Sequence, residues 1–180
     1  MGNKILLVVD MQNDFITGSL GSKEAQAIVP NVVKKIKEWD GDIIATRDTH
    51  HDNYLQTREG RHLPVRHCIY HSVGWEIESS VKEALMAKKA TFMDKTTFGS
   101  LQLIDIISRR DVSKDGYADE IEVIGLCSDI CVVSNALLLK NAFPERDISV
   151  DETCCAGVTP ELHDAAMKTM RSCQINIKKG

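Results

Sequence analysis

VIGLCSDICVVSNALLLKNAF, residues 123–143, begins as a short continuous apolar run and continues as a longer run with helical spacing. Short continuous apolar runs are typical of strands in a parallel sheet that is covered on both faces. Cys127 and Cys131, two of the six cysteines, lie where the pattern changes. Three interpretations are open: a redox pair, two small packing residues, or one reactive thiol. The residues elsewhere in the sequence distinguish among them.

The alternation of strand and helix patterns recurs along the chain. Apolar runs predict strands at residues 4–9, 42–46, 65–69, 90–93, 120–126, 147–150 and 173–177. Apolar residues at helical spacing predict helices at residues 25–39, 77–87, 101–109, 129–142 and 160–171. This order favours one α/β domain, residues 1–180, with a three-layer, doubly wound, mostly parallel sheet and helices on both faces.

Composition limits the classes of protein to which the chain can belong. It has 180 residues, of which 43% are hydrophobic and 27% charged, and a net charge of −4. The apolar content suits one globular domain, and the acidic balance is unsuited to nucleic acid. The apolar runs are far shorter than the roughly 20 residues that cross a bilayer. Since there is no secretion signal, we expect a cytoplasmic protein with free thiols and neither a nucleic-acid nor a membrane partner.

Reactive side chains follow several of the predicted strands. Asp10, Asp48 and Lys95 come shortly after three strand ends, and Cys131 follows a fourth. Ligands of open parallel sheets bind beyond the carboxyl ends of the strands, so these side chains should converge. Alone, each has a simpler role: a turn-forming Asp, a solvated Lys, a small core Cys. Together they fit nucleophilic catalysis, in which Cys131 needs a base such as Asp10 and a cation such as Lys95.

Cys131 is expected two residues inside a helix whose turn and cap are Ser128 and Asp129. Free backbone N–H groups and the helix dipole favour negative charge at such a terminus. This position would support both a thiolate and the oxyanion that forms on attack. By contrast, Cys154 and Cys155 are expected in the connection after the strand at 147–150, as packing residues.

Residues 47–74 form a long polar segment with little periodicity. A loop of this length in a compact domain is usually functional, although a solvated polar loop is the simpler interpretation. Imidazole and carboxylate ligands together suit Zn, Fe, Mn or Ni. The side chains of this segment that could bind such a metal are Asp48, His50, His51, Glu59, His62 and His67.

Three stretches carry a resemblance to a known superfamily. LLVVDMQNDF (6–15), KTTFGS (95–100) and GLCSDICVVSNAL (125–137) resemble, in order and spacing, the three motifs of the isochorismatase-like cysteine hydrolases, which include the nicotinamidases. The resemblance covers nearly the whole chain and implies a catalytic triad of Asp10, Lys95 and Cys131. It also implies a cis peptide at Leu126–Cys127 and an oxyanion hole built from the backbone N–H groups of Cys127 and Cys131. The C-x-x-x-C spacing is unlike that of a thioredoxin-type redox pair.

The same resemblance extends to the polar segment. Nicotinamidases bind a divalent metal through an Asp-x-His pair and a later His, which here are Asp48, His50 and His67. Some relatives add a Glu, for which Glu59 is the counterpart, whereas His51 and His62 have none. The implied metal is zinc first, with iron, manganese or nickel as alternatives.

The resemblance also implies substrate contacts. Phe15 would supply one aromatic wall, or else be a core Phe. Leu63 stands where nicotinamidases commonly have an aromatic residue near the substrate ring, which is a departure from the pattern.

The implied protein is a metal-containing cysteine amidase. It would hydrolyse nicotinamide to nicotinate and ammonia through a Cys131 thioester. The alternatives are a cysteine hydrolase of another small amide or carbamoyl compound, and a non-catalytic ligand-binding relative. Such relatives are often dimers or tetramers, so we expect a homo-oligomer that takes a small-molecule amide.

Overall fold

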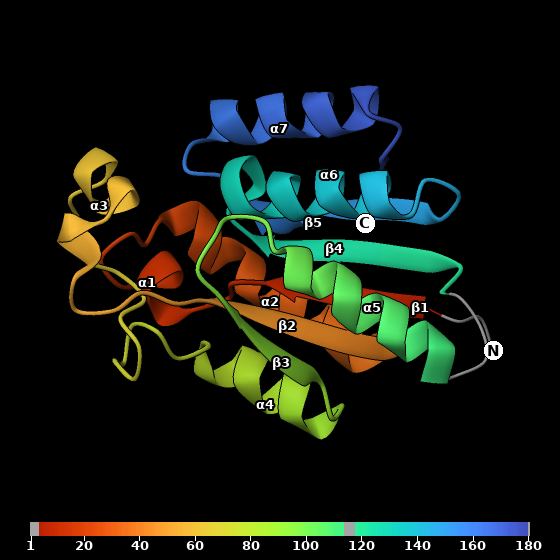
Figure 1. Ribbon diagram of the computed structural model, residues 1–180, viewed down its shortest axis with the longest axis horizontal. Coiled ribbons are helices and arrows are strands. Elements are labelled where there is room, and N and C mark those ends of the chain that lie inside the picture. Colours follow the sequence, from red (N-terminus) through yellow and green to blue (C-terminus); the bar gives the residue numbers. More distant parts are fainter. Residues whose placement is uncertain (1–3, 114–117, 180) are drawn as a thin grey trace.

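A computed structural model describes residues 4–113 and 118–179. Its centre is one six-stranded sheet in the order β3-β2-β1-β4-β5-β6, and every neighbouring pair is parallel (Figure 1). The strands are β1 (Lys4–Val9), β2 (Asp42–Asp48), β3 (Thr91–Lys95), β4 (Glu120–Leu126), β5 (Asp147–Ala156) and β6 (Asn176–Lys178). The predicted α/β class and parallel sheet are confirmed.

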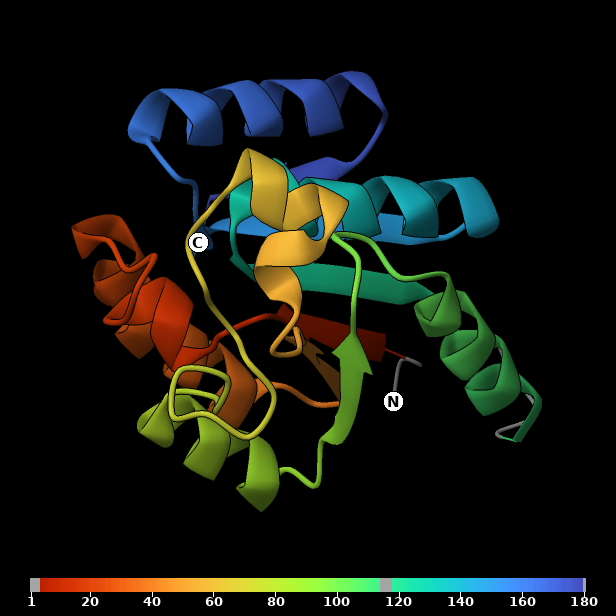
Figure 2. The same ribbon diagram turned by 60° about the vertical axis from the view of Figure 1, so that its left-hand side comes forward.

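Helices cover both faces of the sheet. Figures 1 and 2 show α2 and α4 on one face and α5, α6 and α7 on the other. The helices are α1 (Asn13–Ile16), α2 (Lys23–Glu38), α3 (Arg58–His62), α4 (Ser79–Ala87), α5 (Leu101–Ser113), α6 (Val133–Ala142) and α7 (Pro160–Ser172), with a 3₁₀ turn η1 (Tyr54–Gln56) and a π-helical turn η2 (Ser128–Val132). Within the described ranges, none of these helices has the length and apolar character needed to cross a membrane.

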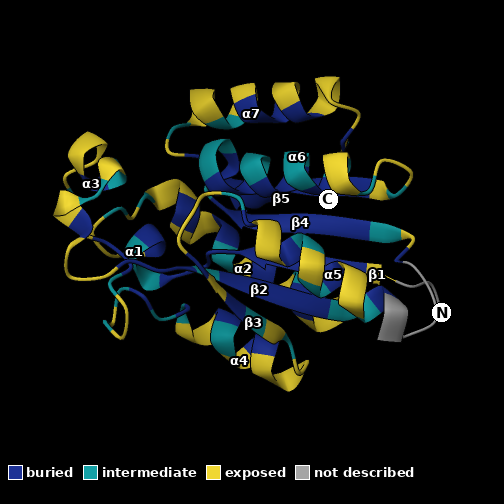
Figure 3. Ribbon diagram, viewed as in Figure 1, coloured by how far each residue is buried: buried dark blue, intermediate teal, exposed yellow. Residues whose placement is uncertain are grey.

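The core lies along the two central strands. β1 is buried from Ile5 to Val9 and β4 from Ile121 to Leu126, as Figure 3 shows in dark blue. Such continuous burial explains why these segments read as unbroken apolar runs. β1 and β4 are also the strands between which the order of the sheet reverses. A ligand site is therefore expected beyond their carboxyl ends.

Two strand predictions need correction. Instead of a strand at 65–69, the chain makes a single parallel bridge between His50 and Ile69, because Cys68 has a left-handed φ of 46° that breaks an extended run. β5 continues to Ala156, so Cys154 and Cys155 lie within a strand and not in the connection predicted after it. The strand continues because the β4–β5 register shifts by a bulge, after which Cys155 pairs with Gly125.

Two short helices were not predicted. α1 follows β1, and α3 lies within the polar segment, where the Thr57 side chain caps it by accepting a hydrogen bond from the Gly60 N–H at 3.0 Å. Both are shorter than two turns, so neither produces a readable apolar period. They matter because they place Phe15 and Glu59 beside the strand ends.

Candidate active site

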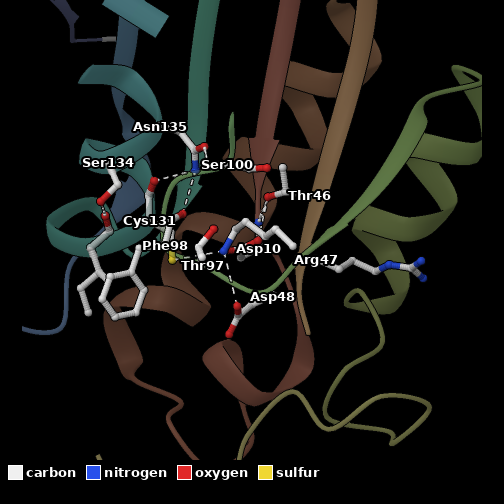
Figure 4. Close-up of polar contacts among 12 residues, drawn as sticks. Asp10, Thr46, Arg47, Asp48, Thr97, Phe98, Ser100, Cys131, Ser134 and Asn135 are labelled. Atoms are coloured by element: carbon white, nitrogen blue, oxygen red, sulfur yellow. Dashed lines mark hydrogen bonds and ion pairs between the residues drawn. The ribbon is translucent and has the colours of Figure 1, made fainter. Parts of the chain in front are cut away.

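Three side chains from different strand ends meet in the interior. Asp10 follows β1, Lys95 ends β3, and Cys131 lies in η2 after β4. Lys95 Nζ lies 2.7 Å from Asp10 Oδ2 and 3.5 Å from Cys131 Sγ. Figure 4 labels Asp10 and Cys131 in this group. The exposed fractions of Asp10, Lys95 and Cys131 are 0%, 3% and 5%. The structure therefore brings together the Asp, Lys and Cys that the sequence singled out.

Burial and mutual attraction set the charges of this group. Burial raises the pKa of the Asp10 carboxyl above 3.8, although the Lys95 ammonium opposes the shift. Burial also acts to lower the pKa of Lys95, but Asp10 and its other anionic neighbours outweigh it and raise that pKa above 10.5. Lys95 is thus held as the ammonium ion.

Cys131 rests as a thiol. Burial raises its pKa well above 9.0, and the negative charge of Asp10 adds to that effect more than Lys95 offsets it. The direction of this shift is opposite to the support for a thiolate that was expected from the helix terminus. Attack by the sulfur therefore requires a base, the role expected of Asp10.

The backbone at Asp10 is held in an uncommon conformation by its neighbour. Asp10 has φ 48°, in the left-handed region that non-glycine residues rarely adopt. The Thr46 hydroxyl donates a hydrogen bond of 2.7 Å to Asp10 Oδ1, and Thr46 Oγ1 accepts one of 3.3 Å from the Asp10 N–H. Thr46 is fully buried in β2. It orients the carboxylate toward Lys95, a role that nothing in the sequence pattern indicated.

The turn that carries Cys131 follows a glycine that no other residue could replace. Gly125 has φ +118°, and a Cβ there would lie 2.1 Å from the Val9 carbonyl oxygen. The peptide Leu126–Cys127 is cis, at the position that the family resemblance implied.

Ser128 and Asp129 do not cap the following helix as predicted. The N-cap position of η2 is Cys127, whose carbonyl oxygen accepts hydrogen bonds of 3.1 Å from the Ile130 N–H and 3.0 Å from the Val132 N–H. The Ser128 hydroxyl instead lies 3.0 Å from His163 Nδ1, and Asp129 Oδ1 accepts a hydrogen bond of 3.0 Å from the Val158 N–H. Ser128 thus fastens the turn to α7, and Asp129 fastens it to the segment between β5 and α7.

Asn135 ties the Cys131 turn to the loop after β3. Its Nδ2 donates hydrogen bonds to the carbonyl oxygens of Cys131, at 2.8 Å, and Phe98, at 3.1 Å. Its Oδ1 accepts one of 3.0 Å from the Ser100 N–H. This fully buried side chain therefore sets the spacing between two of the stretches that carry the family resemblance (Figure 4).

A second polar group adjoins the first. Asp48, His50, Glu59 and His67 each offer a ligand atom, and these atoms all lie within 4.8 Å of one another. His50 Nε2 lies 2.9 Å from Asp48 Oδ2 and 3.5 Å from Glu59 Oε1. The other carboxylate oxygen of Asp48 lies 3.5 Å from Lys95 Nζ, so Asp48 links the two groups. All four predicted ligands are therefore brought together.

The chemistry of this second group fits a divalent metal. His67 Nδ1 bonds the Val65 carbonyl oxygen at 2.8 Å, which fixes the ring so that Nε2 faces the carboxylates. His50 Nε2 is buried without a hydrogen-bond partner of good geometry in the described chain. Two imidazoles and two carboxylates around one point match zinc and related metals.

Without a metal, protons would have to hold this group together. Burial raises the pKa of Asp48, but the nearby rings of His50 and His67 outweigh it and lower that pKa well below 3.8. Burial lowers the pKa of His67, while the nearby Asp48 carboxylate and the hydrogen bond to Val65 raise it above 6.5 overall. Positive charge is therefore strongly favoured here, whether it is carried by protons or by a metal ion.

Gln12 supports this group from behind. Its Oε1 accepts a hydrogen bond of 2.7 Å from the Asp48 N–H, and its Nε2 donates bonds of 2.8 Å to the carbonyl oxygens of Asp48 and Trp75. Gln12 lies within the first of the three quoted stretches, which is the one signal that could have pointed to it.

A cavity of about 560 Å³ opens onto both groups. Phe15 and Leu63, the two residues predicted to contact substrate, both line it, and the Phe15 ring centroid lies 5.6 Å from that of His67. His62 also lines the cavity, whereas His51 contacts the Tyr70 ring and lines a different hollow.

The fold and the site together define an α/β protein with a buried Asp–Lys–Cys group beside a candidate metal site at the strand ends. Residues 4–178 match the family model of the isochorismatase domain, and the chain belongs to that family.

Characterised and solved relatives resemble the chain over its full length. It is 22% identical to the nicotinamidase of Saccharomyces cerevisiae, over 97% of this chain and 98% of that protein. A crystal structure of a nicotinamidase/pyrazinamidase from Bacillus subtilis superimposes with a TM-score of 0.85 at 22% identity, covering 98% of this chain and 100% of that one. A structure of the pyrazinamidase of Pyrococcus horikoshii in complex with zinc gives 0.79 at 26% identity, covering 99% of both.

Proposed function

We propose that this protein is a metal-containing cysteine amidase that hydrolyses nicotinamide to nicotinate and ammonia. The observation that carries the proposal is the position of Lys95 Nζ, within 2.7 Å of Asp10 and 3.5 Å of Cys131 in a nearly solvent-free interior. An ammonium ion that contacts both a carboxylate and a thiol is suited to nucleophilic acyl transfer. The names of the relatives support an amide as the substrate.

In the first half of the reaction, the Asp10 carboxylate takes the Cys131 proton as the sulfur attacks the amide carbon. The raised pKa of Asp10 makes it a stronger base than an exposed carboxylate. Lys95 stabilises the negative charge that passes through the sulfur. The oxyanion accepts hydrogen bonds from the backbone N–H groups of Cys127 and Cys131. The Asp10 carboxyl then returns its proton to the leaving nitrogen, and ammonia departs from a thioester.

In the second half, the Asp10 carboxylate takes a proton from water, which attacks the thioester carbon. The carbon–sulfur bond breaks, the sulfur recovers a proton, and the carboxylate product leaves. The same base, cation and N–H groups thus serve both halves.

Asp48, His50, Glu59 and His67 would hold the metal, with zinc preferred over iron, manganese or nickel. When bound, the metal supplies a Lewis acid that can anchor a ring nitrogen of the substrate. Phe15 and Leu63 would contact the ring from the cavity walls.

Two alternatives to nicotinamide hydrolysis are a cysteine hydrolase with another substrate and a ligand-binding protein without catalysis. Leu63, in place of an aromatic residue, favours a related amide or carbamoyl compound as substrate, and a ligand-binding relative would keep the triad without using it. Rates of ammonia release from nicotinamide and from a panel of small amides distinguish a nicotinamidase from a hydrolase of another amide. Alkylation tests the ligand-binding alternative, because an activated Cys131 should be alkylated faster than the exposed Cys173. Alkylation of Cys131 that is no faster than that of Cys173 would favour the ligand-binding relative. Light scattering tests the expected dimer or tetramer.

A further inference from the structure

The walls of the cavity differ sharply from its two ends. Polar side chains gather at the metal group and at the Cys131 turn, and Ser22 and His62 are the other polar side chains on the lining. The remaining side chains are apolar and come from five separate segments; they include Phe15, Leu20, Leu63, Phe98, Ile130 and Val158. Such walls favour an uncharged, largely apolar ligand.

The mouth of the cavity is apolar as well. Leu63, Phe98 and Val158 are 37%, 47% and 52% exposed, respectively, although each is a large hydrophobic residue. They stand on three different segments, after α3, after β3 and after β5. Exposed apolar side chains that cluster around a pocket gain free energy when a ligand covers them.

The cavity is larger than a single-ring amide requires. Nicotinamide has nine heavy atoms and would fill at most about 270 Å³ if each atom took the share of one liquid water. The cavity measures about 560 Å³. Roughly half of the cavity volume would remain for a further group.

The lining also excludes anionic substrates. Among the described residues, no Lys or Arg lines the cavity. Lys95 is buried and already contacts Asp10, Asp48 and Cys131, so it is committed to its own neighbours. Apart from His62, the thiols and the metal ligands, the lining carries no ionisable side chain among the described residues, so a carboxylate placed against Phe98 and Val158 would lose hydration without a charged partner.

We propose that the site is built for uncharged aromatic carboxamides that carry an apolar extension beyond the first ring, an inference that rests on the proposed amidase function. The carboxamide lies at Cys131 and the ring beside Phe15. The extension lies against Leu63, Phe98 and Val158 and covers their exposed surface.

Binding to the zinc-supplied Cys131→Ala protein tests the inference without turnover. Calorimetry would compare nicotinamide with 5-phenylnicotinamide, which adds six ring carbons, and with 5-carbamoylpyridine-3-carboxylate, which adds a charge. Complete burial of the phenyl group predicts roughly 100-fold tighter binding, and at least about tenfold is expected at an open mouth. The carboxylate should bind at least about tenfold more weakly than nicotinamide. Equal or weaker binding of the phenyl compound, or undiminished binding of the carboxylate, would overturn the inference.

A matched pair of variants locates the extension. Val158→Asn places a neutral polar group at the mouth, and Val73→Asn makes the same change at an exposed position of the loop before Trp75, outside the cavity lining. The preference for 5-phenylnicotinamide over nicotinamide should fall several-fold in Val158→Asn and stay at the wild-type ratio in Val73→Asn. An unchanged ratio in Val158→Asn would contradict the proposal.

Turnover by the wild-type protein distinguishes the two proposals. Ammonia release from nicotinamide without preference for the phenyl compound would overturn this inference and leave the amidase function standing. If no amide releases ammonia while the binding order holds, the amidase function fails and the ligand class of the cavity is supported.

Discussion

Replacing Thr46 with Val should leave the Asp10 carboxylate poorly oriented for its reaction while nearly preserving the shape of the buried side chain. Valine has nearly the shape of threonine, and Thr46 is fully buried. The change removes the hydroxyl that donates to Asp10 Oδ1 at 2.7 Å and accepts from the Asp10 N–H. A hydrogen bond to a charged group contributes about 1.5–3 kcal/mol. If that bond holds Asp10 in its reactive position, kcat/KM should fall by roughly 10- to 100-fold.

The Thr46→Val substitution should also shift the pH dependence of activity in a defined direction. The hydrogen bond from Thr46 is one of the contacts that lower the pKa of Asp10, although burial raises it overall. Removing the bond raises the pKa of Asp10 further. Because the carboxylate is the active form, activity is lost as pH falls through this pKa, and the acid limb of the profile should move to higher pH.

Ammonia release from nicotinamide, measured as kcat/KM from acid to neutral pH, is the assay. Thr169→Val is the control, since the Thr169 hydroxyl bonds the Ala165 carbonyl oxygen at 3.0 Å on the exposed side of α7. Thr169→Val should reproduce the wild-type profile. A Thr46→Val profile that superimposes on the wild type would refute the assignment of Thr46 as the residue that orients Asp10.

Three further outcomes are expected. Lys95→Met leaves the Asp10 carboxylate buried without its ammonium partner. Activity should therefore fall by at least about 1000-fold, and the free energy of unfolding, measured by denaturation in urea, should fall by about 3–5 kcal/mol. A variant that keeps a tenth of wild-type activity would contradict this prediction. Gln12→Ala removes three hydrogen bonds around Asp48 and Trp75, so affinity for zinc in a competition titration should fall about 10- to 100-fold, whereas unchanged affinity would show that the support is dispensable. Removal of metal by a chelator should lower Tm and zinc should restore it, since a bound ligand stabilises the folded state; His67→Ala should show no zinc-dependent rise, and an equal rise would place the metal elsewhere.

The central strands could be predicted because burial on both faces leaves a simple trace in the sequence. β4 begins and ends where its apolar run does, at Glu120 and Leu126. The continuation of β5 to Ala156 could not be predicted, because it depends on a bulge and on the partner strand. The π-helical turn at Ser128–Val132 was hidden for a similar reason, since its apolar residues also fit an α-helix.

Some residues of the candidate site could be predicted from the sequence and others could not. Asp10, Lys95 and Cys131 could be found because each follows a strand, and parallel strands bring their ends to one edge. Thr46 could not be found, because its importance lies in a hydrogen bond to a residue 36 positions away. Asn135 lies in the third quoted stretch, but its role depends on hydrogen bonds to the loop after β3, which the sequence does not reveal. The thiol state of Cys131 was also beyond the sequence, since it depends on how deeply the side chain is buried.

We propose that Cys131 forms a covalent acyl intermediate with help from Asp10 and Lys95. The most direct measurement is intact-protein mass spectrometry after a millisecond acid quench of the wild-type protein with nicotinamide, followed by peptide mapping. The predicted result is one nicotinoyl group on Cys131 of the wild-type protein at early times. The Cys131→Ala protein should carry none, and the wild-type protein should have lost it once the substrate is consumed. Ammonia release by the Cys131→Ala protein at the wild-type rate, with no acylated peptide in either protein, would contradict it.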